Sequence, residues 1–326
     1  MNNRRKLIIA IGASTIAAPL ASFAQQQTQV FRIGFLGSAS ASGYSNMVEA
    51  LRLGLREMGY VEGKNLAIEF RWADEQYDRL PGLAKDLVRQ NISVLVTHGT
   101  PAIRAARQVT QTVPIVMVTS SDAVASGLIS TLARPGGNIT GSTLLNPEIN
   151  AKRLELIKEA APRIQRVAVI LNANNPSNAP ILQAMEKAAQ SLRLTIKVFE
   201  VRRLDEIKKT LPAIAKGADA VTISQDAIFF ENARAIAELM TKVRLPSAGF
   251  KEFAEAGGLI GYGPNYLELY RRAAYFMDRI LKGAKPADLP VEQPTKFELV
   301  INLKPAKALG IKIPNSILVR ADKVIE

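Results

Sequence analysis

The chain has 326 residues, about twice the ~150 typical of one domain, which predicts two lobes rather than a single small module. Hydrophobic residues make up 48% and charged residues 22%, which is typical of a globular protein and excludes a disordered chain. The absence of Cys excludes disulfides, thiolate nucleophiles and cysteine-bound metals, and a single histidine, His98, excludes a site built on paired histidines. We therefore predict neither a metal nor a cofactor.

The net charge of +13 does not by itself point to a nucleic-acid partner. Lys and Arg are spread among Glu and Asp, as in the pairs Glu155–Lys158 and Asp278–Lys282, and no basic cluster is interleaved with aromatic residues. The distribution favours a solvated surface, and we predict no binding of nucleic acid.

Residues 1–24 have the pattern of a secretory signal peptide. Arg4, Arg5 and Lys6 precede an apolar run over 7–20. Ser22 and Ala24 place small residues at the two positions that a signal peptidase recognises, so cleavage is expected after Ala24. The run is too short for a membrane anchor, which needs roughly 20 apolar residues. The paired arginines leave the twin-arginine export route open beside the general one. The sequence predicts a mature protein free in a periplasm, and without Cys it is not a lipoprotein.

Short β-branched runs then alternate with helical patterns, which is typical of a parallel sheet with helices on both faces. In chain order, the first half has predicted strands at 31–36, 66–70, 94–97 and 114–118, and predicted helices at 44–58, 76–90 and from Pro101 onward. The second half repeats this plan with strands at 166–171, 194–199, 220–223 and 246–250, and helices at 179–192, 204–216 and 229–243. A last helix at 267–281 and a strand at 298–303 follow.

Alignment of Arg32 with Arg166 brings strand onto strand and loop onto loop. The predicted fold class is therefore α/β, with two similar open parallel-sheet, Rossmann-like lobes joined by a hinge. We expect the chain to cross between the lobes near 141–146 and 261–265. The predicted division is lobe I at 31–143 plus about 265–290, and lobe II at 144–262 plus about 291–326.

Ligands of such sheets bind beyond the carboxyl ends of the strands, so two facing lobes predict a cleft there. Small polar loops, 38–42 and 172–178, follow the first strand of each lobe and favour gripping a ligand over transforming it. Thr100 is expected to cap the helix that Pro101 opens, which leaves backbone N–H groups for a carboxylate or phosphate. His98 lies at the same strand end.

Two acidic residues follow predicted strands. Asp122 comes after Ser120-Ser121, and Asp226 holds the position in lobe II that His98-Gly99-Thr100 holds in lobe I. Either carboxylate can bind an ammonium or a hydroxyl group, and either can cap the next helix. Acid–base catalysis by the two is an alternative, although nothing in the spacing requires it.

Several motifs are similar to those of exported solute-binding proteins of ABC transporters, in the branch that includes tryptophan-type and other aromatic amino-acid-binding members. The resemblance covers nearly the whole mature chain, and the residues that carry it are 59–65 (GYVEGKN), 100–102 (TPA), 135–141 (PGGNITG), 280–292 (ILKGAKPADLPVE) and 300–303 (VINL). It implies a type I periplasmic-binding-protein fold that closes on one small molecule and delivers it to a permease in the inner membrane.

The resemblance also implies that Thr100, Pro101, Asp122, Asn174 and Ser177 contact the ligand, together with Asp226. Asn265 stands where amino-acid-binding relatives tend to carry Asp, which favours a carboxylate ligand without an amine over an amino acid. With the residue-based candidates, the predicted ligand-binding set is Ser38, Ser42, Tyr44, His98, Thr100, Pro101, Ser121, Asp122, Asn174, Ser177, Asp226 and Asn265.

We predict a monomeric receptor with no catalytic residue. Two alternatives stay open: a periplasmic α/β enzyme that uses Asp122 or Asp226, and a ligand-sensing partner of a membrane receptor.

Overall fold

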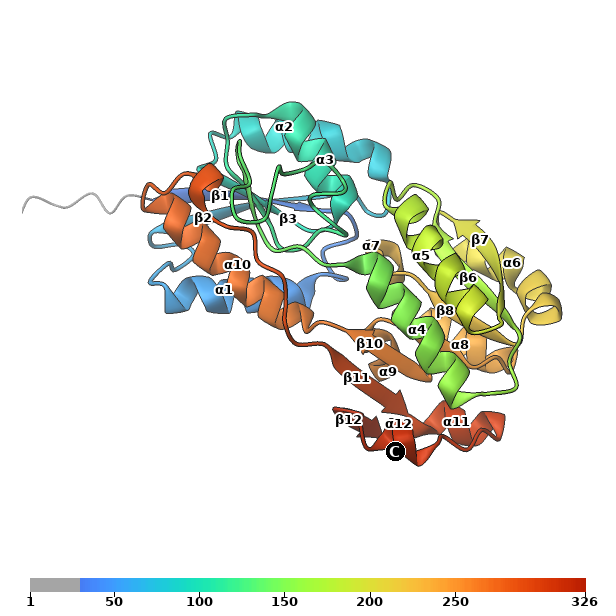
Figure 1. Ribbon diagram of the computed structural model, residues 1–326. Coiled ribbons are helices and arrows are strands. Elements are labelled where there is room, and N and C mark those ends of the chain that lie inside the picture. The colour runs from blue at the N-terminus through green and yellow to red at the C-terminus, as the bar shows by residue number, and fades with distance from the viewer. Residues whose placement is uncertain (1–29) are drawn as a thin grey trace, which may run out of the picture.

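The computed structural model describes residues 30–326, so the predicted signal peptide lies outside the described residues. Figure 1 shows two α/β lobes side by side, with the chain passing between them in three extended segments. None of the helices in the described range is both long and apolar enough to cross a bilayer.

Lobe I contains a five-stranded sheet. Its elements are β1 (Phe31–Gly37), α1 (Ser45–Glu57), β2 (Leu66–Trp72), the 3₁₀ turn η1 (Tyr77–Arg79), α2 (Leu80–Arg89), β3 (Val94–Thr97), α3 (Thr100–Val109), β4 (Ile115–Met117) and β5 (Ile139–Gly141). The strand order is β2-β1-β3-β4-β5, and every pair is parallel. Side chains of α2 and α3 fill the core on one face of this sheet.

Lobe II repeats that order. Its elements are α4 (Asn146–Ala160), β6 (Arg166–Asn172), α5 (Asn178–Ser191), β7 (Thr195–Val201), α6 (Leu204–Gly217), β8 (Ala220–Ile223), α7 (Ala227–Glu231), α8 (Ala233–Lys242), β9 (Ser247–Gly249), α9 (Lys251–Glu255) and β10 (Ile260–Gly263). The strands β7-β6-β8-β9-β10 follow the same sequence of neighbours as the lobe I sheet. The predicted fold class of two similar parallel-sheet lobes of type I is confirmed.

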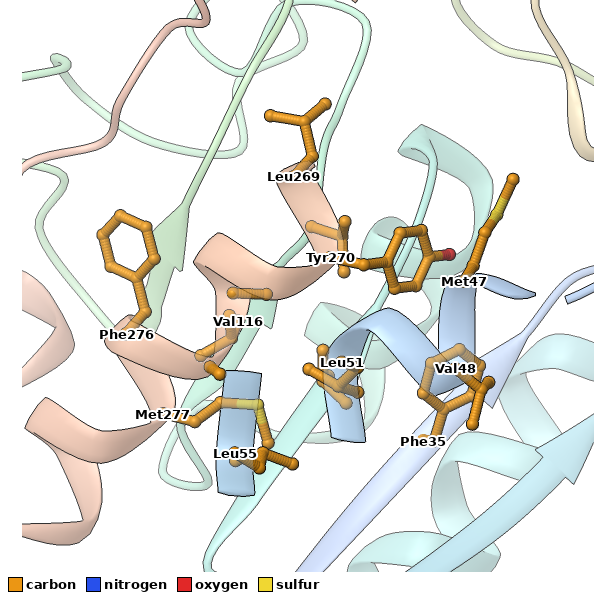
Figure 2. Packing of buried hydrophobic residues seen from close by; sticks show 14 of the residues in the cluster. Phe35, Met47, Val48, Leu51, Leu55, Val116, Leu269, Tyr270, Phe276 and Met277 are labelled. Carbon is orange, nitrogen blue, oxygen red and sulfur yellow. The ribbon is translucent and has the colours of Figure 1, made fainter. Parts of the chain in front are cut away.

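The last segment serves both lobes. It contains α10 (Tyr266–Leu281), η2 (Pro286–Asp288), β11 (Glu298–Asn302), α11 (Leu303–Leu309), α12 (Asn315–Leu318) and β12 (Lys323–Ile325). The helix α10 packs on α1 of lobe I, whereas β11 and β12 extend the lobe II sheet to seven strands. In Figure 2 side chains of α1 and α10, among them Leu51, Leu55, Tyr270 and Met277, point toward one another, with Val116 of β4 in the same cluster.

One feature of lobe II differs from an all-parallel sheet. The strand β11 pairs antiparallel with β10, because the chain returning from lobe I enters the sheet edge in the opposite direction. The predicted helix 229–243 is also two helices, α7 and α8, which Asn232 separates. The Asn232 side chain donates to the Ile228 carbonyl and to Glu75 of lobe I, and these bonds hold the break in place.

The crossings lie at 142–145, 264–265 and 293–297, between elements of different lobes. Val291 and Glu292 still donate backbone hydrogen bonds to Leu132 and Gly141 of lobe I. The division of the chain between the lobes remains a proposal, and these bonds move its last boundary from about 291 to about 293.

Candidate functional site

A cavity lies between the lobes, at the carboxyl ends of the strands β3 and β4 of lobe I and β8 of lobe II. The space between its lining atoms is about 380 Å³, a volume that includes space open to solvent. Both lobes contribute to its lining, which consists of Ser38, Tyr77, His98, Gly99, Thr100, Pro101, Thr119, Ser120, Ser121, Asn146, Asn175, Gln225, Asp226 and Ala227. The site is therefore complete only when the lobes are together.

The amino end of α3 forms one wall of this cavity. Gly99 has φ +85° and ψ 144°, a backbone conformation that favours glycine, and it turns the chain from β3 into the helix. Pro101 lies in the first turn, as expected. The predicted cap by Thr100 is wrong, because its Oγ1 accepts instead from the Ser121 N–H at 3.1 Å. The Thr100 and Ala102 N–H groups donate to no described residue, which leaves them for an anion.

Two polar side chains on the cavity wall have no hydrogen-bond partner among the described residues. Ser121 follows β4, and its side chain is buried with an unpartnered Oγ. Asn146 begins α4 at the first crossing, and its Oδ1 is likewise buried and unpartnered. An unsatisfied buried polar atom costs about 1–3 kcal/mol, so a polar ligand that bonded both would remove that penalty.

Asp226 differs from Ser121 and Asn146, because its carboxylate already accepts hydrogen bonds from described residues. It accepts from the Tyr77 hydroxyl at 2.6 Å, from Asn172 Nδ2 at 2.9 Å, from Asn175 Nδ2 at 2.8 Å and from the Ile228 N–H at 3.2 Å, which caps α7. Burial raises the pKa of Asp226, and the four donors act against that rise. The Asp226 oxygens hold the loops of lobe II together and reach across to lobe I.

A second, apolar cavity adjoins the first. Its lining is Ala39, Gly43, Tyr44, Met47, His98, Ala227 and Phe230, so His98 and Ala227 belong to both cavities. We call the first the polar compartment and the second the apolar compartment. Together they suit a molecule with a polar end and an apolar end.

His98 forms the partition between the two compartments. Its ring stacks on Tyr266 with centroids 5.5 Å apart, and its Nδ1 lies 2.9 Å from the Tyr270 hydroxyl. Burial lowers the pKa of His98 to about 4, so the imidazole is neutral at pH 7. A neutral ring packed among aromatics offers shape and one hydrogen bond rather than charge.

Three polar bridges join the lobes beside the compartments. Besides the Tyr77–Asp226 bond, Asn232 Nδ2 donates to Glu75 Oε1 at 2.6 Å. Glu231 accepts from the Ser40 N–H at 3.1 Å and from the Ser40 hydroxyl. The two lobes are thus in direct contact, which defines a closed arrangement.

Seven of the twelve predicted residues line a compartment. Ser38, His98, Thr100, Pro101, Ser121 and Asp226 line the polar compartment, and Tyr44 lines the apolar one. Whether they contact a ligand stays a prediction.

The other five lie elsewhere. Ser42 bonds Ser40 at the surface, and Asp122 caps its own turn by accepting from the Val124 and Ala125 N–H groups. Asn174 is exposed, and Ser177 is buried outside both compartments. Asn265 caps α10 and lines an open groove beside the hinge, so its position gives no information about a ligand amine in the cavity.

The lining also includes residues that the sequence reasoning did not select. Asn175 and Gln225 lie next to the predicted residues Asn174 and Asp226, so the position of these loops at strand ends indicates the cavity even though the exact residues differ. Tyr77 and Asn146 reach the cavity from η1 and α4, and no local pattern marks them. Within residues 30–326 no group of three or more His, Asp or Glu side chains could hold a metal ion.

Comparison with known proteins gives consistent matches. A family model described as ABC transporter substrate binding protein matches residues 33–325. A tyrosine-binding protein of Clostridioides difficile is 24% identical over 260 residues, which cover 79% of this chain and 74% of that protein.

Two solved structures superpose closely on this chain. A domain from Streptococcus pneumoniae, solved in complex with L-Trp, has a TM-score of 0.84 at 26% identity and covers 91% of this chain and all of that one (100%). A conserved domain protein from Vibrio cholerae has a TM-score of 0.85 at 26% identity with the same coverage. The similarity therefore extends over both lobes.

Proposed function

The chain belongs to the ABC transporter substrate binding protein family, and on that premise we propose that it is the periplasmic receptor of an ABC importer, which closes on one small organic molecule. Two features of the closed cavity support this proposal. Buried polar atoms without partners, on Ser121 and Asn146, face a space that both lobes enclose. Direct bridges between the lobes offer a closed state for delivery to a permease.

The observation that carries the proposal furthest is the pairing of a polar with an apolar compartment. The free N–H groups of α3 and the Ser121 hydroxyl suit a carboxylate. Tyr44, Met47 and Phe230 suit an apolar or aromatic side chain next to it. We infer that the ligand is an aromatic carboxylate or amino acid, in line with the L-Trp and tyrosine named for the relatives.

Whether the ligand carries an amine depends on what could receive it. Asp226 already accepts four hydrogen bonds, so an ammonium group would have to displace one of its donors. Asn146 Oδ1 is an unpartnered acceptor on the wall, and it is uncharged. These contacts favour a carboxylate whose amine, if present, is weakly held.

The carboxylates that an enzyme would use are engaged in the fold. Asp122 and Asp226 each accept backbone N–H bonds as caps, and Asp226 also holds three side chains. Such saturation favours binding over acid–base chemistry and supports a receptor rather than an enzyme.

Native mass spectrometry of the protein purified from periplasm should reveal a bound aromatic acid that dissociates unchanged. Isothermal titration with L-tryptophan, L-tyrosine and 3-phenylpropionate should then give one site per chain for at least one of them. Chemical conversion of the bound molecule during incubation, or the absence of binding by all three, would contradict the proposal.

A further inference from the structure

The side chain of Arg153 is fully buried, with 0% of its surface exposed. It lies on the helix α4, which begins at the cavity. Its hydrogen bonds go to neutral acceptors. Nε and Nη2 donate to the Tyr262 carbonyl at 3.0 and 2.8 Å, and Nη1 donates to Asn150 Oδ1 at 3.2 Å. No carboxylate of the described residues lies within ion-pair distance of it, which is rare for a buried cation.

The charged groups around Arg153 leave its positive charge largely uncompensated. The acidic groups that act on the Arg153 charge are Tyr266, Glu252 and Tyr262, of which Glu252 is the carboxyl group; burial raises the pKa of Glu252 to about 7, and one of its oxygens has no partner. The neighbouring Lys251 is already paired with Glu298 at 3.0 Å. Burial lowers the pKa of Arg153 to about 10, which still leaves it protonated at neutral pH.

Gln225 connects this charge to the cavity. Its Oε1 lies 3.4 Å from Arg153 Nη2, and its side chain lines the polar compartment. A guanidinium can only donate, so the Gln225 oxygen turns toward Arg153 and its NH₂ group turns away. No described residue accepts from that NH₂ group, which is therefore free for a ligand.

We propose that Arg153 is a positioning residue that fixes the Gln225 amide as a donor into the polar compartment and makes that compartment select a carboxylate. This inference rests on the proposed function and specifies which end of the ligand is recognised there. The carboxylate would meet the Gln225 NH₂ group, the Ser121 hydroxyl and the free N–H groups of α3. Arg153 itself would not touch the ligand.

A purely architectural role is the competing explanation. Arg153 also approaches the Ile223 carbonyl, so it bonds the ends of β8 and β10 and would stabilise lobe II without any ligand. The two explanations differ in what they predict for a charged ligand and its neutral isostere. Loss of architecture weakens both ligands alike, whereas loss of the positioned donor weakens the carboxylate selectively.

The test is isothermal titration of 3-phenylpropionate against 3-phenylpropanamide, and of L-tryptophan against L-tryptophanamide. For Gln225→Leu and Arg153→Met we expect the affinity for each carboxylate to fall about tenfold or more relative to its amide. Gln225→Glu is the sharpest variant, because its new carboxylate would pair with Arg153. It should preserve or raise the melting temperature and still abolish the preference for the carboxylates.

Arg163→Met removes an exposed positive charge from the same lobe and serves as the matched control, with no change in preference expected. An unchanged carboxylate-to-amide ratio in Gln225→Leu and Gln225→Glu would overturn the inference while leaving the proposed function intact. Wild-type protein that binds none of the four probes would instead overturn the proposed function, and the inference with it.

Discussion

The polar residues that line the cavity are of two kinds. Some have side chains whose hydrogen bonds are made by other residues, and others have side-chain atoms with no hydrogen-bond partner among the described residues. Asp226 is of the first kind, because three side chains and a backbone N–H already bond it. Ser121 and Asn146 are of the second kind. The division predicts opposite consequences for stability and for binding when a side chain of each kind is changed.

Ser121→Ala should separate these consequences. The substitution removes a buried hydroxyl that has no partner, so the free energy of unfolding of the ligand-free protein should stay equal or rise. Affinity for 3-phenylpropionate or L-tryptophan should fall by about 10- to 100-fold, since a hydrogen bond to a charged group is lost. Chemical denaturation and titration calorimetry measure the two effects, with the exposed Ser191→Ala as control. A loss of stability together with unchanged affinity would be the contrary result.

His98 should make stability depend on pH. The His98 imidazole has a pKa of about 6.5 in the unfolded chain, whereas burial lowers its pKa to about 4 in the folded protein. The unfolded state therefore gains protons first, and the His98 contribution is lost as the pH falls from about 6.5 to 4, by about 3 kcal/mol in all. Guanidinium denaturation at pH 7 and pH 4.5 should show a smaller drop for His98→Gln than for wild type. Equal drops in the two proteins would contradict this assignment.

At the scale of elements, lobe I contains a closely packed pair of helices, α1 and α10. The helices α1 and α10 come from distant parts of the chain, and their side chains interlock over the sheet (Figure 2). Gly54 lets them approach, because a Cβ there would lie 2.6 Å from the Arg271 carbonyl oxygen. Since α10 begins directly after a crossing, this contact also anchors the hinge.

The same substitution should therefore have opposite signs on two helices. Gly54→Ala should lower the free energy of unfolding by about 1–3 kcal/mol, because the neighbouring backbone must shift. Gly82→Ala, on α2 with no atom within 4 Å of the added Cβ, should raise it by about 0.5–1 kcal/mol through helix propensity. Denaturation midpoints of the two variants measure the contrast. A stabilised Gly54→Ala would show that the helices are not packed this closely.

At the scale of the whole molecule, the lobes meet through polar bridges and through apolar contacts, such as that of Phe230 of lobe II with the lobe I core. Four apolar clusters fill the two faces of the two sheets. Across the mouth the bridges are Tyr77–Asp226, Glu75–Asn232 and Ser40–Glu231. These bridges are few and part-buried, and water can replace their hydrogen bonds when the lobes separate, which suits a movement between open and closed states.

Tyr77→Phe should shift that equilibrium toward the open state. It removes the hydroxyl that Asp226 accepts from the other lobe, so the radius of gyration from X-ray scattering should rise and the Kd for 3-phenylpropionate should increase about tenfold. Tyr60→Phe removes a comparable hydroxyl–carboxylate bond inside lobe I, to Asp278 at 3.1 Å. That control should lower thermal stability without changing the radius of gyration or the Kd. Matching effects of the two variants would rule out a specific role of Tyr77 in closure.

The two-lobed α/β architecture can be predicted from the sequence alone, because the alternation of β-branched runs with amphipathic helices is a local property of each segment. The sequence also placed the strand-end loops, including Thr100, Ser121 and Asp226, since a loop that follows a parallel strand must reach the same sheet edge. Which of those side chains remain free for a ligand depends on the packing of the folded chain. Tyr77 donates a hydrogen bond to Asp226 from the other lobe, and Asn146 lines the cavity from the first crossing. Arg153, 72 residues away in the chain, orients Gln225. Such pairings depend on how distant segments pack, and no local pattern records them.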